Sequence, residues 1–502
     1  MSRPITVRNL TAQPLTIKLV ERYEHPESID RRASNFTSLM SNVTGGQHAP
    51  PPARAELPEK AERFAHTDVN IRLEPFSTAK TDIHVAERDA NDIVRLTLEG
   101  EMGGRWRMEV PSRSTLTERL TPLTPDDAKH DYRARYLAHS VFVAIIEEYN
   151  AKAWMKEFHD DTSLAALSIP GTHNSPTYYK ALPSVRCQAV SPREQLDNGV
   201  RFFDIRVQPQ NIDDAKNDEL NLVHGVFPIS LTGPKKFRDL LSTVRDFLKE
   251  NPSETVIFSL KREGAGDATD QHLSQILRDH YTGSANTEAP NNWYTNPKVP
   301  LLGAVRGKII IMRRFALSDR VKSEWAGKGW GLNAENWAYN SPDCTCGDVR
   351  VQDFCEVLEP ESIEKKIALC CDHFERAAQV ICPVPVPGLT TDPLHPVPAG
   401  PLFVNFLSAS NFWKVGCWPD KIAAKLNPAV TNFLLEKHGI GSDQGTDGGA
   451  EEGEGEGRVP GDGSVGIVVC DWVGKDGDWD LIRAIITMNS KLLWTQRGVG
   501  WT

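Results

Sequence analysis

The chain has 502 residues, of which 39% are hydrophobic and 25% are charged, and its formal net charge at pH 7 is −10. This composition is typical of a soluble globular protein and argues against a nucleic-acid-binding protein, whose usual mark is a basic stripe. No run approaches the ~18 apolar residues of a transmembrane helix, and the N-terminus lacks the apolar core of a signal peptide. We therefore expect a cytoplasmic protein, with export without a leader left open.

Residues 1–150 predict an accessory domain of the β-sandwich type. Alternation of apolar and polar residues, bounded by Gly, Pro and Asp, is typical of half-buried antiparallel strands. Such segments are 5–11, 14–24, 68–76, 80–87, 92–100, 105–112 and 136–148, whereas the polar, Pro-rich residues 35–65 predict a long loop. Two roles for this domain stay open, a structural one and docking to a membrane or a partner.

From residue 151 to residue 502 the pattern changes to alternating strands and helices. Apolar strands are expected at 164–171, 200–207, 220–227, 254–263, 307–315, 401–410 and 465–473, and helices at 191–199, 235–251, 270–281 and 360–381. Strands buried on both faces and separated by helices favour an α/β fold with a parallel sheet, here a (β/α) barrel of the TIM type. Residues 439–464 are acidic and Gly-rich and predict a disordered surface insertion.

Polar residues end the predicted barrel strands, at the edge where barrel enzymes carry their chemistry. Two histidines can act as general base and general acid because imidazole titrates near neutral pH, and a carboxylate can orient one of them. Arginine can bind a phosphate through two hydrogen bonds. The strand-end set therefore predicts cleavage of a phosphodiester by an internal hydroxyl. Its members are His173, Asn174, Asp204, Arg206, His224, Lys261, Glu263, Arg313, Arg314 and Asp471.

Several of these residues also have a purely structural interpretation. Asp204 and Arg206 lie two apart on one predicted strand, so they share a face and could form an ion pair. His224 could be an ordinary loop histidine, and Asp471 could cap a loop. Taken singly, none of these residues decides between the two interpretations.

The nine cysteines favour reduced thiols over a disulfide framework, because their number is odd and several lie in apolar segments. Cys344 and Cys346 form a CTC motif in a predicted loop, where a disulfide is the alternative. A zinc site is not expected there, since the chain has no paired CxxC motifs.

An ordered set of motifs resembles the X domain of phosphatidylinositol-specific phospholipase C, the bacterial single-domain type more than the multidomain animal type. The motifs are LSIPGTHNS, GVRFFDIRV, LVHGVF, NPSETVIFSLKRE, LGAVRGKIIIMRRF, VQDF, VNFLSAS and GIVVCDWV, and the resemblance covers roughly residues 155–490. It implies a distorted TIM barrel that acts at a peripheral membrane surface. The implied reaction cleaves phosphatidylinositol to diacylglycerol and an inositol phosphate by way of the 1,2-cyclic phosphate.

The resemblance also implies a role for each site residue. His173 would be the general base for the inositol 2-hydroxyl, with Asp471 orienting it, and His224 would be the general acid for the leaving oxygen. Arg206 would bind the phosphate at the place of calcium in the animal enzymes, so no cofactor is expected and calcium is not favoured. Asn174 belongs to the catalytic group, although the bacterial pattern has aspartate there. The expected headgroup contacts are Lys261, Arg314, Asp353, Phe354 and Asp204.

Other functions stay open beside this one. The aromatic residue that stacks on inositol in the family would lie near Phe354 and Cys355, and a cysteine at that position leaves other headgroups open. A glycerophosphodiesterase-like enzyme would need metal-binding carboxylates, against which Asn174 and Arg206 argue. A catalytically weak relative that binds lipid or a partner is the third alternative.

Overall fold

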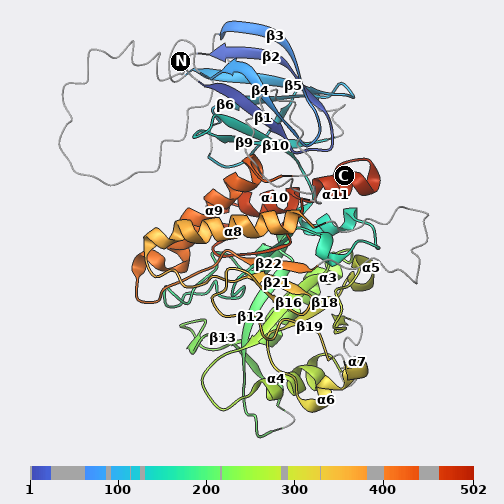
Figure 1. Ribbon diagram of the computed structural model, residues 1–502, viewed down its shortest axis with the longest axis vertical. Coiled ribbons are helices and arrows are strands. Elements are labelled where there is room, and N and C mark those ends of the chain that lie inside the picture. The colour runs from blue at the N-terminus through green and yellow to red at the C-terminus, as the bar shows by residue number, and fades with distance from the viewer. Residues whose placement is uncertain are drawn as a thin grey trace, which may run out of the picture. The chain divides into compact units, whose positions relative to one another are not determined.

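The computed structural model describes residues 3–23, 63–85, 92–112, 115–124, 130–214, 217–283, 292–327, 329–380, 401–439 and 463–501. Nearly all of the loop predicted at 35–65 and of the insertion predicted at 439–464 lies outside these residues. The chain divides into two compact units, one formed mainly by residues 1–148 and one formed by residues 149–498 without 443–452 (Figure 1). In the part of the chain that is described, no helix has the length and apolarity needed to span a membrane.

The first unit consists of two five-stranded sheets. One sheet has the order β4-β1-β10-β9-β7 and the other has the order β3-β2-β5-β6-β8, with β1 and β10 parallel and the remaining neighbours antiparallel. The strands are β1 (Pro4–Asn9), β2 (Leu15–Tyr23), β3 (Arg63–Leu73), β4 (Ser77–His84), β5 (Ile93–Gly100), β6 (Arg105–Val110), β7 (Glu118–Arg119), β8 (Thr121–Pro122), β9 (Tyr132–Leu137) and β10 (Phe142–Glu147).

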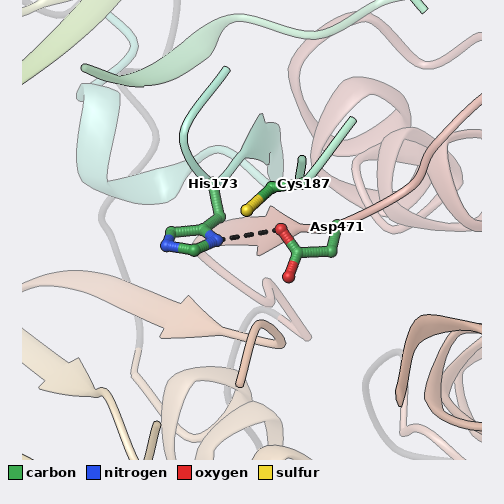
Figure 2. Close-up of side chains that lie close together, drawn as sticks. All are labelled: His173, Cys187 and Asp471. Carbon is green, nitrogen blue, oxygen red and sulfur yellow. Dashed lines mark hydrogen bonds and ion pairs between the residues drawn. The ribbon is translucent and has the colours of Figure 1, made fainter. Parts of the chain in front are cut away.

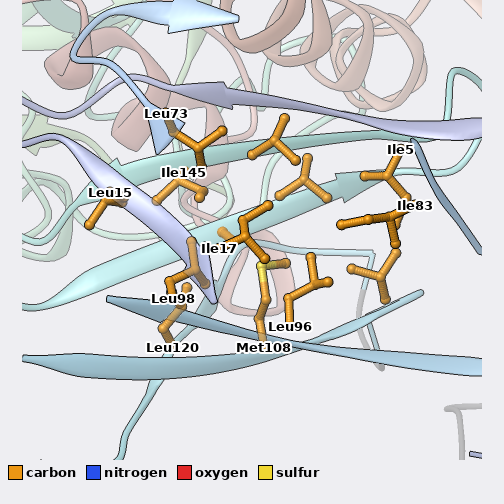
Figure 3. Close-up of a cluster of buried hydrophobic side chains, with 14 of the residues drawn as sticks. Ile5, Leu15, Ile17, Leu73, Ile83, Leu96, Leu98, Met108, Leu120 and Ile145 are labelled. Carbon is orange, nitrogen blue, oxygen red and sulfur yellow. The ribbon is translucent and has the colours of Figure 1, made fainter. Parts of the chain in front are cut away.

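One apolar core joins these two sheets. Alternate residues of the strands point inward, so that Ile5 of β1 and Leu96 of β5 belong to the same buried cluster (Figure 3). Across the core, the ring of Trp106 in β6 meets the ring of Tyr132 in β9 edge-on, with centroids 4.7 Å apart. Two sheets packed over a shared core make this unit a β-sandwich.

The second unit is built on a curved sheet whose central strands are all parallel. The order is β17-β18-β16-β12-β11-β23-β22-β21-β20. These strands are β11 (Ile169–Thr172), β12 (Phe202–Pro209), β16 (Val256–Arg262), β17 (Trp293–Tyr294), β18 (Ile309–Arg313), β20 (Cys344–Cys346), β21 (Val349–Gln352), β22 (Leu402–Phe406) and β23 (Ile467–Cys470). Among the described strands no pairing joins the two ends of the sheet, so it is an open barrel, bounded by strands of two or three residues.

Helices cover this sheet. They are α2 (Pro192–Asp197), α3 (Phe237–Glu250), α4 (Asp270–Ile276) with a π-helical turn (Leu277–Tyr281), α5 (Leu302–Val305), α6 (Asp319–Lys322), α7 (Glu324–Gly327), α8 (Ile363–Ala378), α9 (Pro419–Glu436), α10 (Asp480–Thr487) and α11 (Ser490–Arg497). The helices α8, α9 and α10 pack side by side, with α8 against β22 and α10 against β11 (Figure 1). The predicted alternation of strands and helices is confirmed.

One strand runs against the prediction. The segment 220–227, expected as a parallel barrel strand, is a hairpin of β13 (Leu220–His224) and β14 (Phe227–Pro228), and β13 pairs antiparallel with β12 and with β15 (Lys235–Lys236). The connection 210–219 is too short for the crossover that parallel pairing requires, so the chain turns back. A further short strand, β19 (Leu332–Asn333), pairs with β18.

The register of the parallel strands brings the carboxyl ends to one edge. Thr172 of β11 lies opposite Cys470 of β23, and Arg206 of β12 lies opposite Lys261 of β16. Close approach of β11 and β12 needs Gly171, because a Cβ at that residue would lie 2.9 Å from the ring of Phe202. The Pro-Gly pair of the first motif is therefore part of the strand, and His173 follows it directly.

Candidate active site

A cavity of about 290 Å³ lies at the carboxyl ends of the parallel strands. Six of the residues expected in the site line it, namely His173, Arg206, His224, Lys261, Arg314 and Asp353. The remaining lining residues are Ala334, Glu335, Trp337, Tyr339, Cys355, Ser408, Ala409 and Ser410. The site thus gathers side chains from strands, a hairpin and the loops that follow β18, β21 and β22.

His173 and Asp471 form a hydrogen-bonded pair at this edge. Nδ1 of His173 lies 2.9 Å from Oδ1 of Asp471 (Figure 2). Because a carboxylate can only accept, Nδ1 carries the proton and Nε2 keeps its lone pair in the neutral ring. Burial alone would lower the pKa of His173, but the Asp471 carboxylate and the Cys187 sulfur outweigh burial and raise that pKa well above its ordinary value.

His224 reaches the cavity because β13 runs back along β12. Nδ1 of His224 donates to the backbone carbonyl of Val185 over 2.9 Å, which leaves Nε2 for a reacting group. The two imidazoles meet at right angles, with ring centroids 6.0 Å apart. Burial opposes protonation of His224, but the Cys187 sulfur outweighs it, so the pKa of His224 is raised. The tight hairpin turn uses Gly225, whose φ is +59°.

Arg206 is held between two carboxylates. It forms ion pairs with Asp204, at 2.9 Å, and with Glu263, and Lys261 lies 2.9 Å from the same Glu263 oxygen. Burial opposes ionisation of Asp204, but the guanidinium of Arg206 holds the pKa of that carboxyl at about 2. Glu263 also accepts from the backbone nitrogen of Gly225 over 2.8 Å, which ties the His224 hairpin to this network.

Arg314 lies on the other side of Asp204. Its Nη1 donates to Oδ1 of Asp204 over 3.2 Å, and its Nη2 lies 3.8 Å from Asp353. The guanidinium stacks on Trp337, with Cζ 3.8 Å from the ring centroid. Burial is the main reason that the pKa of Arg314 is lowered, although it stays a cation at neutral pH. These contacts fix Arg314 in one orientation at the cavity wall.

Asn174 lies behind His173 and does not line the cavity. Its φ of +42° is in the left-handed region, which asparagine tolerates better than most residues. Nδ2 of Asn174 lies 3.0 Å from Nε2 of His173. Its Oδ1 is buried and has no hydrogen-bond partner among the described residues. Rotation of the amide by 180° would place Oδ1 in the position of Nδ2, next to Nε2 of His173. The Asn174 side chain can therefore hydrogen-bond to Nε2 whether or not that nitrogen carries a proton.

Two predicted headgroup contacts lie elsewhere. Asp204 is completely buried and lies beneath the cavity, where it positions Arg206 and Arg314. The ring of Phe354 does not line the cavity; Lys365 lies over it at 4.9 Å, and Cys355 lines the wall instead. In a strand-like segment neighbouring side chains point to opposite sides, which explains why Cys355 and not Phe354 faces inward.

The sequence did not single out three residues of the site. Cys187 lies in the loop 181–191, which carries no motif, and touches both histidines. Tyr339 and Glu335 come from the irregular segment after β19. No sequence pattern reports the position of such loops, because their conformation depends on the tertiary packing around them.

Residues 161–315 match the family model "Phosphatidylinositol-specific phospholipase C, X domain". The X domain as matched contains His173, Arg206, His224, Lys261 and Arg314, whereas Asp353 and Asp471 lie beyond it.

Relatives of known name share this segment. A 1-phosphatidylinositol phosphodiesterase of Listeria monocytogenes is 37% identical over 171 residues, which are 32% of this chain and 48% of the relative. One from Staphylococcus aureus (strain Newman) is 25% identical over 209 residues, 40% of this chain and 62% of the relative. The human "PI-PLC X domain-containing protein 1" is 28% identical over 148 residues, 24% and 44% of the two chains. The alignments thus span about half the length of these relatives.

Solved structures of bacterial phosphatidylinositol-specific phospholipases C also align with the chain. A Staphylococcus aureus structure has a TM-score of 0.49 at 21% identity, and the match covers 68% of this chain and 97% of that one. The Listeria monocytogenes structure has a TM-score of 0.45 at 23% identity, with 68% and 99% coverage.

Proposed function

We propose that this protein cleaves phosphatidylinositol-type phospholipids to diacylglycerol and an inositol phosphate, by way of the inositol 1,2-cyclic phosphate, on a barrel of the PI-PLC type. The observation that carries the proposal is the pair of histidines, 6.0 Å apart, beside a buried arginine on one cavity. The names of the Listeria and Staphylococcus relatives support it.

His173 acts as the general base in this proposal. Its Nε2 removes the proton of the inositol 2-hydroxyl, and that oxygen attacks the phosphorus. The Asp471 carboxylate holds Nδ1–H at 2.9 Å and stabilises the imidazolium that forms. Asp471 therefore positions and polarises the base without touching the substrate.

His224 acts as the general acid. Because its Nδ1–H is held by the Val185 carbonyl, Nε2 delivers a proton to the diacylglycerol oxygen as the P–O bond breaks. In the second half of the reaction the roles reverse: His224 activates a water molecule that opens the cyclic phosphate, and His173 returns its proton to the 2-hydroxyl.

Arg206 stabilises the charge on the phosphate oxygens. Asp204 and Glu263 hold the guanidinium before any substrate arrives, and preorganised cations of this kind stabilise a transition state without reorganisation. Arg314 and Lys261 contact the headgroup hydroxyls. The exposed ring of Tyr339 lines the same cavity and supplies the aromatic surface that the sequence did not locate.

Calcium does not fit the residues present. Calcium takes six to eight oxygen ligands. The carboxylates of Asp204 and Glu263 surround the Arg206 guanidinium instead, and Asp204 also binds Arg314. Next to His173, the buried side-chain oxygens without a partner among the described residues are Oδ1 of Asn174 and Oε1 of Gln188, which are too few for a calcium ion. We therefore propose a reaction without a metal cofactor.

An exposed apolar rim beside the cavity supports binding to a membrane surface. The apolar rim comprises Val226, Leu358, Phe412, Trp413 and Val415, and Trp413 is 89% exposed. Phe412 stacks on Phe227 of the His224 hairpin with centroids 5.8 Å apart, and Asn411 donates to the Leu358 carbonyl. Contiguous exposed apolar side chains mark interaction sites, and tryptophan favours the lipid interface.

The test is cleavage of phosphatidylinositol in vesicles, with and without a chelator of divalent ions. We expect cleavage that persists with the chelator and falls at least about 100-fold in His173→Ala, while His66→Ala, in the first unit, leaves it unchanged. Cleavage within a few-fold of wild type in His173→Ala would show that the base is assigned wrongly. Loss on chelation with recovery on adding calcium would overturn the arginine mechanism. Cleavage only of glycerophosphodiesters would favour the alternative enzyme.

A further inference from the structure

Cys187 lies at the centre of the catalytic groups, yet the proposed reaction does not use it. Its side chain is fully buried, and its Sγ lies 3.9 Å from Nδ1 of His224 and 3.9 Å from Nδ2 of Asn174. One ligand atom each of His173, Cys187 and Asp471 lies within 4.8 Å of the others. Figure 2 shows the sulfur pointing toward the hydrogen-bonded pair. No second group of His, Cys, Asp or Glu of this kind occurs among the described residues.

These three side chains are the ligands that zinc prefers. Zinc binds thiolate, imidazole and carboxylate at about 2.0–2.3 Å in a four-coordinate arrangement, whereas calcium and magnesium prefer oxygen ligands alone. One thiolate and one carboxylate also balance the two positive charges of the ion, so its burial leaves no net charge. Ligand atoms held tetrahedrally around zinc lie roughly 3.3–3.8 Å apart. The 2.9 Å separation of Nδ1 and Oδ1 would therefore widen a little, and the other separations, which do not exceed 4.8 Å, would shorten a little.

Two groups can supply the fourth ligand, the side chain of Asn174 and a water molecule from the cavity. The buried Oδ1 of Asn174 has no partner among the described residues, and the amide that carries it already contacts both His173 and Cys187. His173 lines the cavity, so an ion has a path from the solvent and a water molecule can complete the coordination. The unpartnered oxygen points to a ligand independently of the three-residue cluster.

We propose that His173, Cys187 and Asp471 bind Zn²⁺, or a divalent ion of similar softness, and that the bound ion inhibits cleavage. The ion bonds to Sγ, to Nδ1 and to Oδ1, and the thiol proton passes to the solvent. The hydrogen bond from Nδ1 to Asp471 is lost, and the ring proton moves to Nε2. A neutral imidazole with its proton on Nε2 has no lone pair there, so His173 can no longer accept the proton of a hydroxyl.

The inhibitory part rests on the proposed function, whereas the metal site itself does not. The first experiment therefore uses no substrate: Co²⁺ is titrated into the metal-free full-length protein and the absorption spectrum is recorded. We expect the visible bands of four-coordinate cobalt and a strong near-ultraviolet band from thiolate-to-cobalt charge transfer. The near-ultraviolet band should vanish in Cys187→Ser and persist in Cys355→Ser, whose thiol lines the cavity next to His173. A wild-type spectrum without that band overturns the site, whether or not the variant folds.

The second experiment measures inhibition by Zn²⁺ in the vesicle assay. Loss of a residue that only hydrogen-bonds to a metal ligand typically weakens metal binding about 10–100-fold. Loss of the thiolate ligand itself should therefore raise the Zn²⁺ concentration that inhibits cleavage at least about tenfold. Cys355→Ser should leave the inhibitory Zn²⁺ concentration within about twofold of the wild-type value. Equal inhibition of wild type and Cys187→Ser overturns the role of Cys187. An active wild type that zinc does not inhibit overturns the inhibitory role. A protein that binds cobalt through Cys187 but cleaves no phosphatidylinositol refutes the proposed function and leaves the metal site intact.

Discussion

His173 and Asp471 occupy equivalent positions on two neighbouring parallel strands, although 298 residues separate them in the chain. The register pairs Thr172 with Cys470, and each of the two polar residues follows its strand by one position. In both places the next residue, Asn174 or Trp472, has a left-handed backbone that turns the chain away. The pair is thus a consequence of strand register and two turns.

Replacing Asp471 tests this relationship. Asp471→Asn keeps the size of the side chain but removes the negative charge that holds the Nδ1 proton of His173. We expect kcat for phosphatidylinositol cleavage to fall by roughly two to four orders of magnitude with little change in KM, because the loss falls on the transition state. Steady-state kinetics on mixed micelles would measure this. A variant whose KM rises while its kcat is unchanged would place Asp471 in substrate binding instead.

The pH dependence of kcat/KM should be displaced to the alkaline side. The pKa of His173 is raised well above its ordinary value, and a base must be deprotonated, so activity rises as pH increases through that pKa. The pKa of His224 is also raised, and an acid must be protonated, so activity falls again as pH increases through it. Both limbs of the profile should therefore lie above about pH 6.5, the ordinary pKa of histidine. An acidic limb below that value would contradict the assignment of the base.

Asn174→Asp provides a check on the same profile. The backbone at Asn174 is left-handed, and aspartate tolerates this region nearly as well. A second carboxylate near Nε2 would favour the imidazolium, so the acidic limb should move further toward high pH. An unchanged limb would mean that the Asn174 side chain does not face His173 in the working enzyme.

Arg206→Lys should separate charge from geometry. Lysine keeps the positive charge but lacks the planar fork that fits Asp204, Glu263 and a phosphate at once. We expect kcat to fall by roughly 10²- to 10³-fold. If the lysine variant keeps wild-type kcat, a simple positive charge is enough and the fork plays no part.

Asp204→Asn should act mainly on stability. It leaves Arg206 and Arg314 without their shared buried carboxylate, which costs about 3–5 kcal/mol of unfolding free energy. Because the pKa of Asp204 is lowered to about 2, its stabilisation is present above its unfolded pKa of about 3.9 and is lost as pH falls toward 2. Denaturant unfolding at several pH values measures both effects.

Glu254→Gln is the control for that variant. Glu254 and Arg201 form a completely buried pair in which the carboxylate also accepts from the backbone of Met155. Glu254 does not line the cavity. This variant should lose a similar amount of stability, yet its folded fraction should cleave substrate at the wild-type rate. If both variants lose activity only in proportion to unfolding, Asp204 has no role in positioning the arginines.

Trp413→Ala tests the apolar rim. Removing the exposed indole should weaken binding to phospholipid vesicles about tenfold or more, since burial of a large apolar side chain is worth about 1.5–3 kcal/mol. Trp325, which is 47% exposed on α7, serves as the control. Sedimentation with vesicles measures both variants, and equal losses would show that the rim is not a specific contact.

Much of this protein follows from local sequence. The apolar runs predicted every central parallel strand except β21, because strands buried on both faces must be apolar throughout. The helix expected from residue 235 to residue 251 became α3, whose buried apolar face consists of Phe237, Leu240, Leu241, Val244, Phe247 and Leu248. Five of the polar residues that end these runs line one cavity, namely His173, Arg206, His224, Lys261 and Arg314. Parallel strands bring their carboxyl ends to a common edge, and the β13 hairpin adds His224.

Only the tertiary structure decided which partners those residues meet. The antiparallel return of β13 places His224 beside His173, and no local pattern reports that a chain will turn back where a crossover does not fit. Cys187 enters the site from a loop without a motif, and Phe354 faces away while Cys355 faces in. Sequence periodicity specifies which side of an element is buried, but contacts between distant segments depend on register, loop path and packing, which the whole fold determines.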